Sequence, residues 1–125
     1  VPKEKQWQGH AYLRDIFPTL LELTGLPPIQ CDGKSQVPIM HGQISSMYDF
    51  TVGYFRDTQR MIRTDHWKLI EYPLINKTQL FDLQRDSSEQ NDLSHRPEHA
   101  GLRKRLSGEL SQWMETQRAQ QPKTE

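Results

Sequence analysis

The first regular pattern along the chain is an apolar stripe at helical spacing within residues 14–25, "RDIFPTLLELTG". The stripe consists of Ile16, Phe17, Leu20, Leu21 and Leu23. Asp15 is the expected N-cap, because its carboxylate can accept a backbone N–H of the first turn. Pro18 lies within that turn, where its missing N–H costs little, and Gly25 is suited to end the helix. The pattern therefore predicts one helix with an apolar face.

A second region has the composition of short β-strands separated by turns. Aromatic and β-branched residues concentrate in four runs, which predict strands over residues 50–55, 59–64, 67–72 and 79–83. The short polar turns between them favour antiparallel neighbours, and about four strands is an ordinary sheet size. We expect an antiparallel meander here.

The last pattern is again helical. Leu102, Leu106, Leu110 and Trp113 recur at intervals of four, four and three residues, which predicts a helix over residues 97–117. The polar tail, "AQQPKTE", is expected to fray. Together the patterns indicate an α+β fold, in which a small antiparallel sheet of about four strands packs one face against a long C-terminal helix.

The connection over residues 26–47 is rich in Gly, Pro and Ser and is predicted to be long and irregular. Such a loop is unusual inside a compact domain and often lies over another surface. The chain also does not begin with Met, and its first residues lack the apolar core of a signal peptide. We expect a piece of a larger protein, in which the first helix belongs to a domain that is absent here.

Composition narrows the functions that this sequence allows. Of its 125 residues, 34% are hydrophobic, which is low for a self-sufficient domain, and the formal net charge is zero. The neutral balance argues against a nucleic-acid partner, because proteins that bind nucleic acids usually carry an excess of basic residues. No apolar run approaches the roughly 20 residues that span a bilayer, so no membrane span is expected.

Isolated reactive residues give weak signals. Cys31 has no His at a diagnostic spacing and is interpreted as an ordinary loop cysteine. His95 and His99 are four residues apart, but a zinc site needs at least a third ligand, so no metal ligand is assigned. Asn76 begins an "NKT" glycosylation pattern in a predicted turn, and whether it is modified stays open.

The segment "RMIRTDHWKLI", residues 60–70, concentrates cations on a predicted hairpin. These cations are Arg60, Arg63, His66 and Lys68. One interpretation is a structural hairpin whose long side chains lie along apolar surface, with Arg63 or Lys68 paired to Asp82 or Asp65. The other is a cationic rim that meets an anionic ligand.

The order of these motifs resembles that of type I sulfatases, the formylglycine-dependent arylsulfatase family of the alkaline-phosphatase superfamily. "RDIFPTLLELTG" is similar to D-x-x-P-T-L-L-x-L-x-G, and "DGKSQVPIMHG" to D-G-x-S-x-x-P-x-x-x-G. The later stretches resemble R-x-x-R-x-x-x-x-K-L-I, a Leu-Phe-Asp-Leu strand and an acidic D-P-x-E-x-x-N-L turn. The matching residues of these later stretches are Arg60, Arg63, Lys68, Leu69, Ile70, Leu80, Phe81, Asp82, Leu83, Asp86, Glu89 and Leu93. Two positions depart from the pattern: Ser87 replaces Pro, and Asp92 replaces Asn.

The resemblance implies that residues 1–47 end a large α/β domain and cross from it, and that residues 48–125 form the C-terminal sulfatase subdomain. It implies a parent that hydrolyses sulfate esters with a formylglycine and a divalent metal, usually calcium. Those motifs lie upstream of the matched part, and the residues after Cys31 do not fit the maturation motif. No catalytic residue and no cofactor is therefore assigned to this chain, which alone lacks the catalytic motif.

The expected partners are the chain's own N-terminal catalytic domain and a sulfated substrate, with Arg60, Arg63, His66 and Lys68 as the substrate-rim candidates. The particular substrate and the oligomeric state stay open. An extracytoplasmic location, periplasmic or secreted, is favoured only because such sulfatases are often exported. Two alternatives remain: a free-standing interaction module derived from a sulfatase, and the end of another alkaline-phosphatase superfamily enzyme, such as a phosphoesterase or phosphotransferase.

Overall fold

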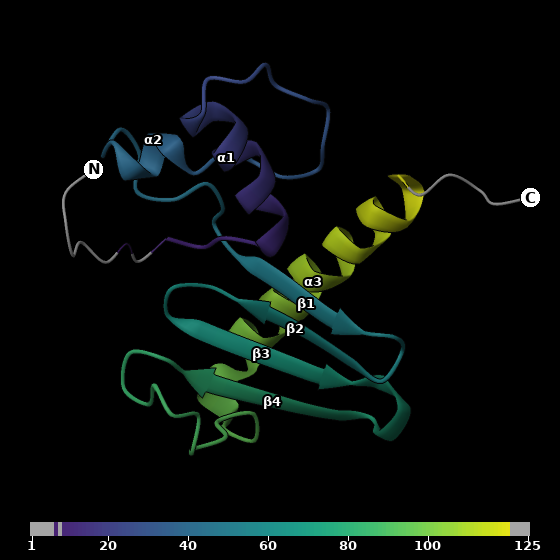
Figure 1. Cartoon of the computed structure of the whole chain (residues 1–125). Helices are drawn as coiled ribbons and strands as arrows, with labels where there is room; N and C mark the ends of the chain where they lie inside the picture. Colours follow the sequence, from purple (N-terminus) through teal and green to yellow (C-terminus); the bar gives the residue numbers. More distant parts are fainter. Residues whose placement is uncertain (1–6, 8, 121–125) are drawn as a thin grey trace, which may run out of the picture. The chain divides into compact units, whose positions relative to one another are not determined.

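The structure, a computed structural model, describes residue 7 and residues 9–120. The chain forms two compact units, of which the first ends at Thr51 and the second begins at Val52. Figure 1 shows the helical elements of the first unit and the sheet and long helix of the second.

The first unit is built around a short helix and a loop that folds back on it. The 3-10 turn η1 (Leu13–Asp15) leads into α1 (Ile16–Leu23), as the apolar pattern predicted. The loop that follows contains a second short helix, α2 (Val37–Met40), where the sequence predicted only irregular chain. Four residues are too few to show a helical period in the sequence. Pro38 also suggests the end of a helix, although proline is compatible with the first turn, where it lies here.

Asp15 occupies the N-cap position of α1, as the sequence predicted, but its side chain makes no capping hydrogen bond to that helix. The carboxylate is instead 1% exposed and holds the loop in place. Its oxygens accept hydrogen bonds from the Tyr48 hydroxyl, at 2.7 Å, and from the backbone N–H of Lys34, at 2.9 Å. They also accept from the Tyr12 N–H, at 2.7 Å, and the Gln36 side-chain amide, at 3.3 Å.

Gly33 explains why the loop can approach η1 so closely. A Cβ atom at this position would lie 2.1 Å from the carbonyl oxygen of Arg14, so any other residue would force the loop away. Thr19 adds a second tie, because its hydroxyl oxygen accepts a hydrogen bond from the Gln36 N–H at 2.9 Å. Gly33 and Thr19 are thus structural requirements of this unit.

The second unit is a meander with the predicted strand order. Its strands are β1 (Thr51–Phe55), β2 (Gln59–Arg63), β3 (Trp67–Tyr72) and β4 (Lys77–Asp82), which neighbour one another in that order. The β2–β3 and β3–β4 pairs are antiparallel. β4 begins two residues before the predicted start, after a 3-10 turn, η2 (Pro73–Ile75). The predicted fold class is confirmed.

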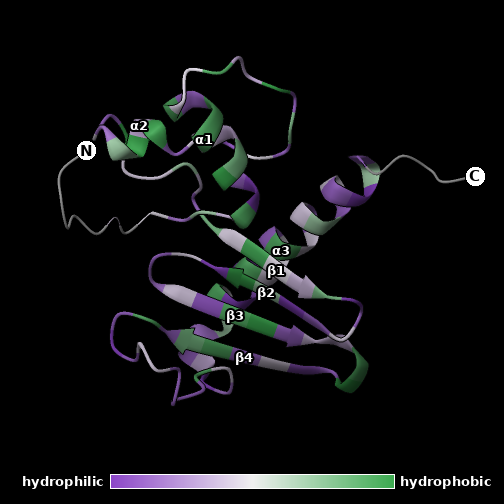
Figure 2. Ribbon diagram, in the orientation of Figure 1, coloured by the Kyte–Doolittle hydropathy of each residue, from purple (hydrophilic) through white to green (hydrophobic). Residues whose placement is uncertain are grey.

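The long helix α3 (Ala100–Gln120) follows the 3-10 turn η3 (Pro97–His99) and packs on one face of the sheet. Ile62, Leu69 and Leu80 lie side by side in register on that face, and each is 0% exposed. Leu106 and Leu110 of α3 are also 0% exposed, as the predicted apolar face requires. Figure 2 shows that the remaining surface of α3 is largely hydrophilic. The helix continues to Gln120, and residues 121–125 of the expected frayed tail lie outside the described residues.

Candidate functional site

The four cationic residues of the hairpin do not form one patch. Because side chains alternate across a strand, Arg60 lies on the same face as Ile62, whereas Arg63 and Lys68 are register partners on the opposite face. His66 lies in the turn between β2 and β3. Of the four, only His66 is among the residues that line a cleft at one end of the sheet.

Lys68 makes a close ion pair with Glu89. Its Nζ lies 2.7 Å and 2.9 Å from the two carboxylate oxygens of Glu89, and both side chains are mostly buried. Glu89 has a φ of +55°, a backbone conformation that favours glycine. A glutamate at this position therefore costs conformational free energy that a glycine would not. The partner of Lys68 is therefore Glu89, and not Asp82 as the sequence interpretation offered. The pair joins the K-L-I strand to the acidic turn.

We expect Lys68→Met to lower the free energy of unfolding by roughly 1–2 kcal/mol, because a charged hydrogen-bonded pair is lost from a partly buried position. Glu89→Gln should cost about the same, and the double variant should cost less than the sum. The measurement is a urea unfolding curve for each variant. Lys104→Met, at an exposed position on α3, is the matched control. Strictly additive losses at Lys68 and Glu89 would contradict a direct pair.

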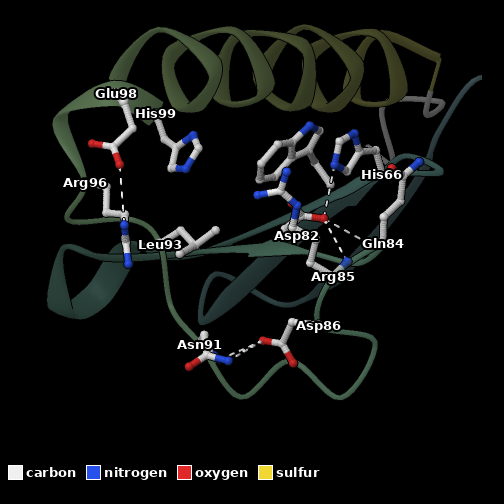
Figure 3. A pocket seen from close by; sticks show the side chains of 11 residues that line it. His66, Asp82, Gln84, Arg85, Asp86, Asn91, Leu93, Arg96, Glu98 and His99 are labelled. Atoms are coloured by element: carbon white, nitrogen blue, oxygen red, sulfur yellow. Dashed lines mark hydrogen bonds and ion pairs between the residues drawn. The ribbon is translucent and has the colours of Figure 1, made fainter.

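The cleft lies where the β2–β3 turn, the end of β4 and the segment before α3 come together, and its volume is about 560 Å³. Figure 3 shows the side chains around it, with His99 between the Arg96–Glu98 pair and the His66–Asp82 pair. The lining residues are His66, Trp67, Asp82, Gln84, Arg85, Asp86, Asn91, Leu93, Arg96, Glu98 and His99.

Three rings form one wall of this cleft. The imidazole of His66 stacks on the indole of Trp67, with 4.4 Å between ring centroids. The ring of His99 lies 5.3 Å from the same indole on a tilted plane. Asp82 holds the wall in place, because its carboxylate lies 3.1 Å from His66 Nε2. The wall is thus fixed by contacts that exist without any ligand.

The carboxylates around the cleft are held in their charged form by hydrogen bonds. Burial opposes the charge of Asp82, but N–H groups of Arg85 and Gln84 and the His66 side chain together lower the pKa of that carboxyl below its ordinary value. Backbone N–H groups of Gln90 and Asn91 lower the pKa of Asp86. For Asp92, the opposing effect of burial is outweighed by N–H groups of Ser94 and Leu80, so its pKa is also lowered.

These lowered pKa values predict that acid destabilises the second unit. A carboxyl whose pKa is lower in the folded state contributes stability above its unfolded pKa, near 3.9, and loses it as the pH falls through the folded value. We expect urea midpoints to fall from about pH 4 downward. Asp92→Asn should lower the urea midpoint at pH 6. It should also make the midpoint fall less steeply with falling pH, because one carboxyl with a lowered pKa has been removed. A midpoint that is constant between pH 5 and pH 2.5 would contradict the prediction.

Among the other sequence candidates, His99 lines the cleft, whereas His95 and Asn76 of the same unit are not among its lining residues. Cys31 is exposed in the first unit and donates at most a weak contact to the Gly33 carbonyl. Within the described residues, no group of three His, Cys, Asp or Glu side chains is arranged to hold a metal ion. Asn76 is exposed and ends η2 with a φ of +47°. No helix among residues 9–120 is long and apolar enough to cross a bilayer.

Sequence reasoning missed most of the cleft. Trp67, Arg85 and Arg96 were not selected, because their pattern in the sequence suits a strand residue and two solvated turn residues. They come together only when η3 returns the chain to the turn between β2 and β3. The one sequence signal for this cleft is the adjacent pair His66 and Trp67 beside a predicted turn.

Comparison with known proteins identifies the class to which this fold belongs. A 2-O GAG sulfatase has a TM-score of 0.69 and 22% identity, with 82% of this chain and 24% of that chain covered. A protein solved in complex with its substrate D-glucosamine-2-N,6-O-disulfate has a TM-score of 0.66 and 23% identity, with 89% and 25% covered. The phosphonate monoester hydrolase of Agrobacterium radiobacter has a TM-score of 0.62 and 23% identity, with 82% and 24% covered.

These likenesses show the fold alone, which this chain shares with part of a sulfatase and part of a phosphonate monoester hydrolase. The chain spans about a quarter of the length of those solved relatives, 24% of the first. The model of the N-sulphoglucosamine sulphohydrolase C-terminal family matches residues 2–116. The chain belongs to this family, as the resemblance of its motifs implied. No curated protein matches it in sequence.

Proposed function

We propose that this chain is the non-catalytic C-terminal part of a sulfate-ester hydrolase and packs on the catalytic domain of its parent. The observation that carries the proposal is the uncovered apolar face of α1. Ile16, Phe17 and Leu20 are 54%, 49% and 54% exposed, although their spacing is that of a buried face. A contiguous exposed apolar surface of this kind usually marks an interface. Leu26 and Ile29, which follow α1, extend it with exposures of 57% and 58%.

The proposal divides the chain as the motifs do. Residues 1–47 end the large α/β domain and cross from it, and residues 48–125 form the smaller C-terminal subdomain. The change from one compact unit to the next between Thr51 and Val52 supports this division.

In such a parent, the catalytic groups are expected upstream of this chain. Formylglycine and a divalent metal, usually calcium, supply the nucleophile and the fixed positive charge for attack on a sulfate ester. Neither is assigned to this chain, since Asp32 and Gly33 after Cys31 depart from the maturation motif and the described residues offer no group of three metal-ligating side chains. The structural relatives include a 2-O GAG sulfatase and a protein solved in complex with its substrate D-glucosamine-2-N,6-O-disulfate. We infer a sulfated saccharide as the substrate class of the parent.

Arg60, Arg63, His66 and Lys68 are the candidate residues for the rim of the substrate pocket, because a sulfate ester needs nearby positive charge. Arg63 is exposed in this unit and is the best placed to reach a ligand. Lys68 is held by Glu89, so its charge is already partly compensated. In the parent, Arg63→Ala should raise KM more than it lowers kcat if the residue contacts the substrate in both the ground and the transition states.

A chromogenic aryl sulfate tests the catalytic part of the proposal. The purified 125-residue chain should give no turnover, and the parent protein should give metal-dependent turnover. The phosphonate monoester hydrolase among the structural neighbours makes an aryl phosphonate ester the necessary second substrate. Turnover by the chain alone, or a parent that cleaves only the phosphonate ester, would overturn the assignment.

The apolar face is tested by substitution in the parent. Phe17→Ser with Leu20→Ser should lower the melting temperature of the parent, because the interface loses two buried side chains, and should make the isolated chain less prone to associate. Glu22→Ala, an exposed polar position on the same helix, is the matched control and should change neither property. An unchanged parent melting temperature in the double variant would mean that α1 does not pack on the catalytic domain.

A further inference from the structure

We infer that one end of the second unit binds a phospholipid surface. This end, here called the turn end, consists of residues 54–58, residues 72–77 and residues 113–118 of α3. The inference concerns where the protein is held, and it does not depend on the reaction proposed for the parent.

The two turns of the turn end lie side by side. β1 ends at Phe55 and β2 begins at Gln59, whereas β3 ends at Tyr72, just before η2. Arg60, near the start of β2, is the register partner of Glu71, near the end of β3. The β1–β2 turn and η2 therefore meet at the same end of the sheet, as Figure 1 shows.

The exposed large apolar side chains of the second unit gather at this end. Among its described residues they are Tyr54, Phe55, Leu74 and Ile75, which are 54%, 65%, 72% and 68% exposed. Figure 2 shows η2 as a hydrophobic segment. Single exposed apolar residues are common on any protein, but a cluster of them usually marks an interaction surface.

Cations border these apolar side chains. Arg56 and Lys77 are exposed on the two turns, and Arg118 is exposed on α3. The two arginines line a hollow of about 190 Å³ beside Tyr54, in which Asp57 is the acidic lining residue. Two guanidinium groups against one carboxylate favour an anionic group such as a lipid phosphate.

Arg56 combines both properties of the turn end. Its φ of +49° is a backbone conformation that favours glycine, so an arginine here costs conformational free energy. The guanidinium carbon lies 5.6 Å from the centre of the Phe55 ring. A ring beside a cation suits a membrane boundary, where the ring enters the hydrocarbon edge and the cation stays at the phosphates.

The shape of the turn end favours a lipid surface over a protein partner. The two turns are about 10 Å apart, which is two strand spacings. A stable protein interface buries about 800 Å² on each partner, more than four side chains on two narrow turns present. Lipid headgroups and acyl chains rearrange around inserted side chains, so a lipid surface needs no matching groove.

The test is flotation of the parent protein with vesicles of phosphatidylcholine, alone or mixed with phosphatidylglycerol. We expect binding to the mixed vesicles at low salt, and about tenfold weaker binding without phosphatidylglycerol or at high salt. The 125-residue chain is compared with Phe17→Ser and Leu20→Ser in place, so that the apolar face of α1 does not itself bind lipid.

Substitutions on η2 test insertion. Leu74→Ser with Ile75→Ser should abolish flotation. Ile75→Trp should add fluorescence that shifts to shorter wavelength on the vesicles and that brominated acyl chains quench. Lys104→Trp, at an exposed position of α3 outside the turn end, should add fluorescence that does neither.

Substitutions of cations test the contact with phosphates. Arg56→Ala with Lys77→Ala should weaken binding to the mixed vesicles about tenfold or more. Lys104→Ala with Arg105→Ala removes two exposed cations of α3 outside the turn end and is the matched control, which should bind as the parent does.

Several outcomes would overturn the inference. They are a parent that does not float, and a Leu74→Ser, Ile75→Ser variant that floats as well as the parent. A lower melting temperature of the parent in this variant would mean that the turn end packs on the catalytic domain. Loss of a dimer would mean that it contacts a second copy. None of these measurements needs catalysis, so a parent without sulfatase activity leaves the result standing.

Discussion

Leu106→Ala should lower the free energy of unfolding of the second unit by about 2–5 kcal/mol. Leu106 is 0% exposed and belongs to the small core that also contains Ile62, Leu69, Leu80 and Leu110, each likewise 0% exposed. Removing a buried isobutyl group loses its transfer free energy and leaves a cavity that neighbouring strands fill only in part. Because whole domains are stable by about 5–15 kcal/mol, this loss is a large share of the total.

Urea unfolding followed by far-ultraviolet circular dichroism measures this effect through the helical signal of α3. Leu74→Ala is the matched control, since Leu74 is 72% exposed in η2, and its effect should stay within about 0.5 kcal/mol. If the two leucine variants unfold at the same urea concentration, the packing of α3 on the sheet is not what stabilises this unit.

Asp15→Asn should have the second largest effect, confined to the first unit. The carboxylate accepts hydrogen bonds from four donors, among them the Tyr48 hydroxyl and the Lys34 N–H. An amide offers one acceptor oxygen and turns two hydrogens toward groups that are themselves donors. Losing charge-assisted bonds and leaving buried donors unpaired should cost about 3 kcal/mol or more. Amide exchange at Lys34 and Gln36 should accelerate while that of β3 stays unchanged.

Tyr48 gives an independent readout of the same substitution. Burial, followed by the hydrogen bond to Asp15 and its negative charge, raises the pKa of Tyr48 to about 12. Removing that charge should lower the pKa of Tyr48 only part of the way toward its ordinary value near 10, because burial remains. Ultraviolet absorbance of the phenolate measures it. Asp32→Asn, an exposed carboxyl of the same loop, should leave both the exchange rates and this titration unchanged.

The sequence predicted the regular elements well where an apolar period was long enough. The four strands and the long helix lie within a few residues of their predicted bounds, since alternation and the Leu102–Leu110 spacing report directly on burial. The short helix α2 was missed, because four residues carry no period. The N-cap position of Asp15 was predicted correctly from a local signal, but its loop partners, up to 33 residues away, could not be predicted in that way.

The candidate site was predicted less well than the fold. The cations were grouped by their proximity in the sequence, but strand alternation sends Arg60 and Arg63 to opposite faces of the sheet. The residues that surround the cleft are separated by up to 33 positions, from His66 to His99. Nothing in their local sequence marks them as neighbours, because their proximity depends on the path of the chain between β4 and α3.

By itself, the sequence determined the elements, the strand order, the apolar faces and the family of this chain, because periodicity and motif order are properties of local sequence. Only the tertiary structure decided that Lys68 pairs with Glu89, that Asp15 organises a loop, and that the faces of His66, Trp67 and His99 line one cleft. Such pairings depend on which distant segments the buried core brings within a few ångströms. The uncovered face of α1 follows from the sequence and the structure together. The sequence shows that this face is apolar, and the structure shows that its own unit leaves it exposed.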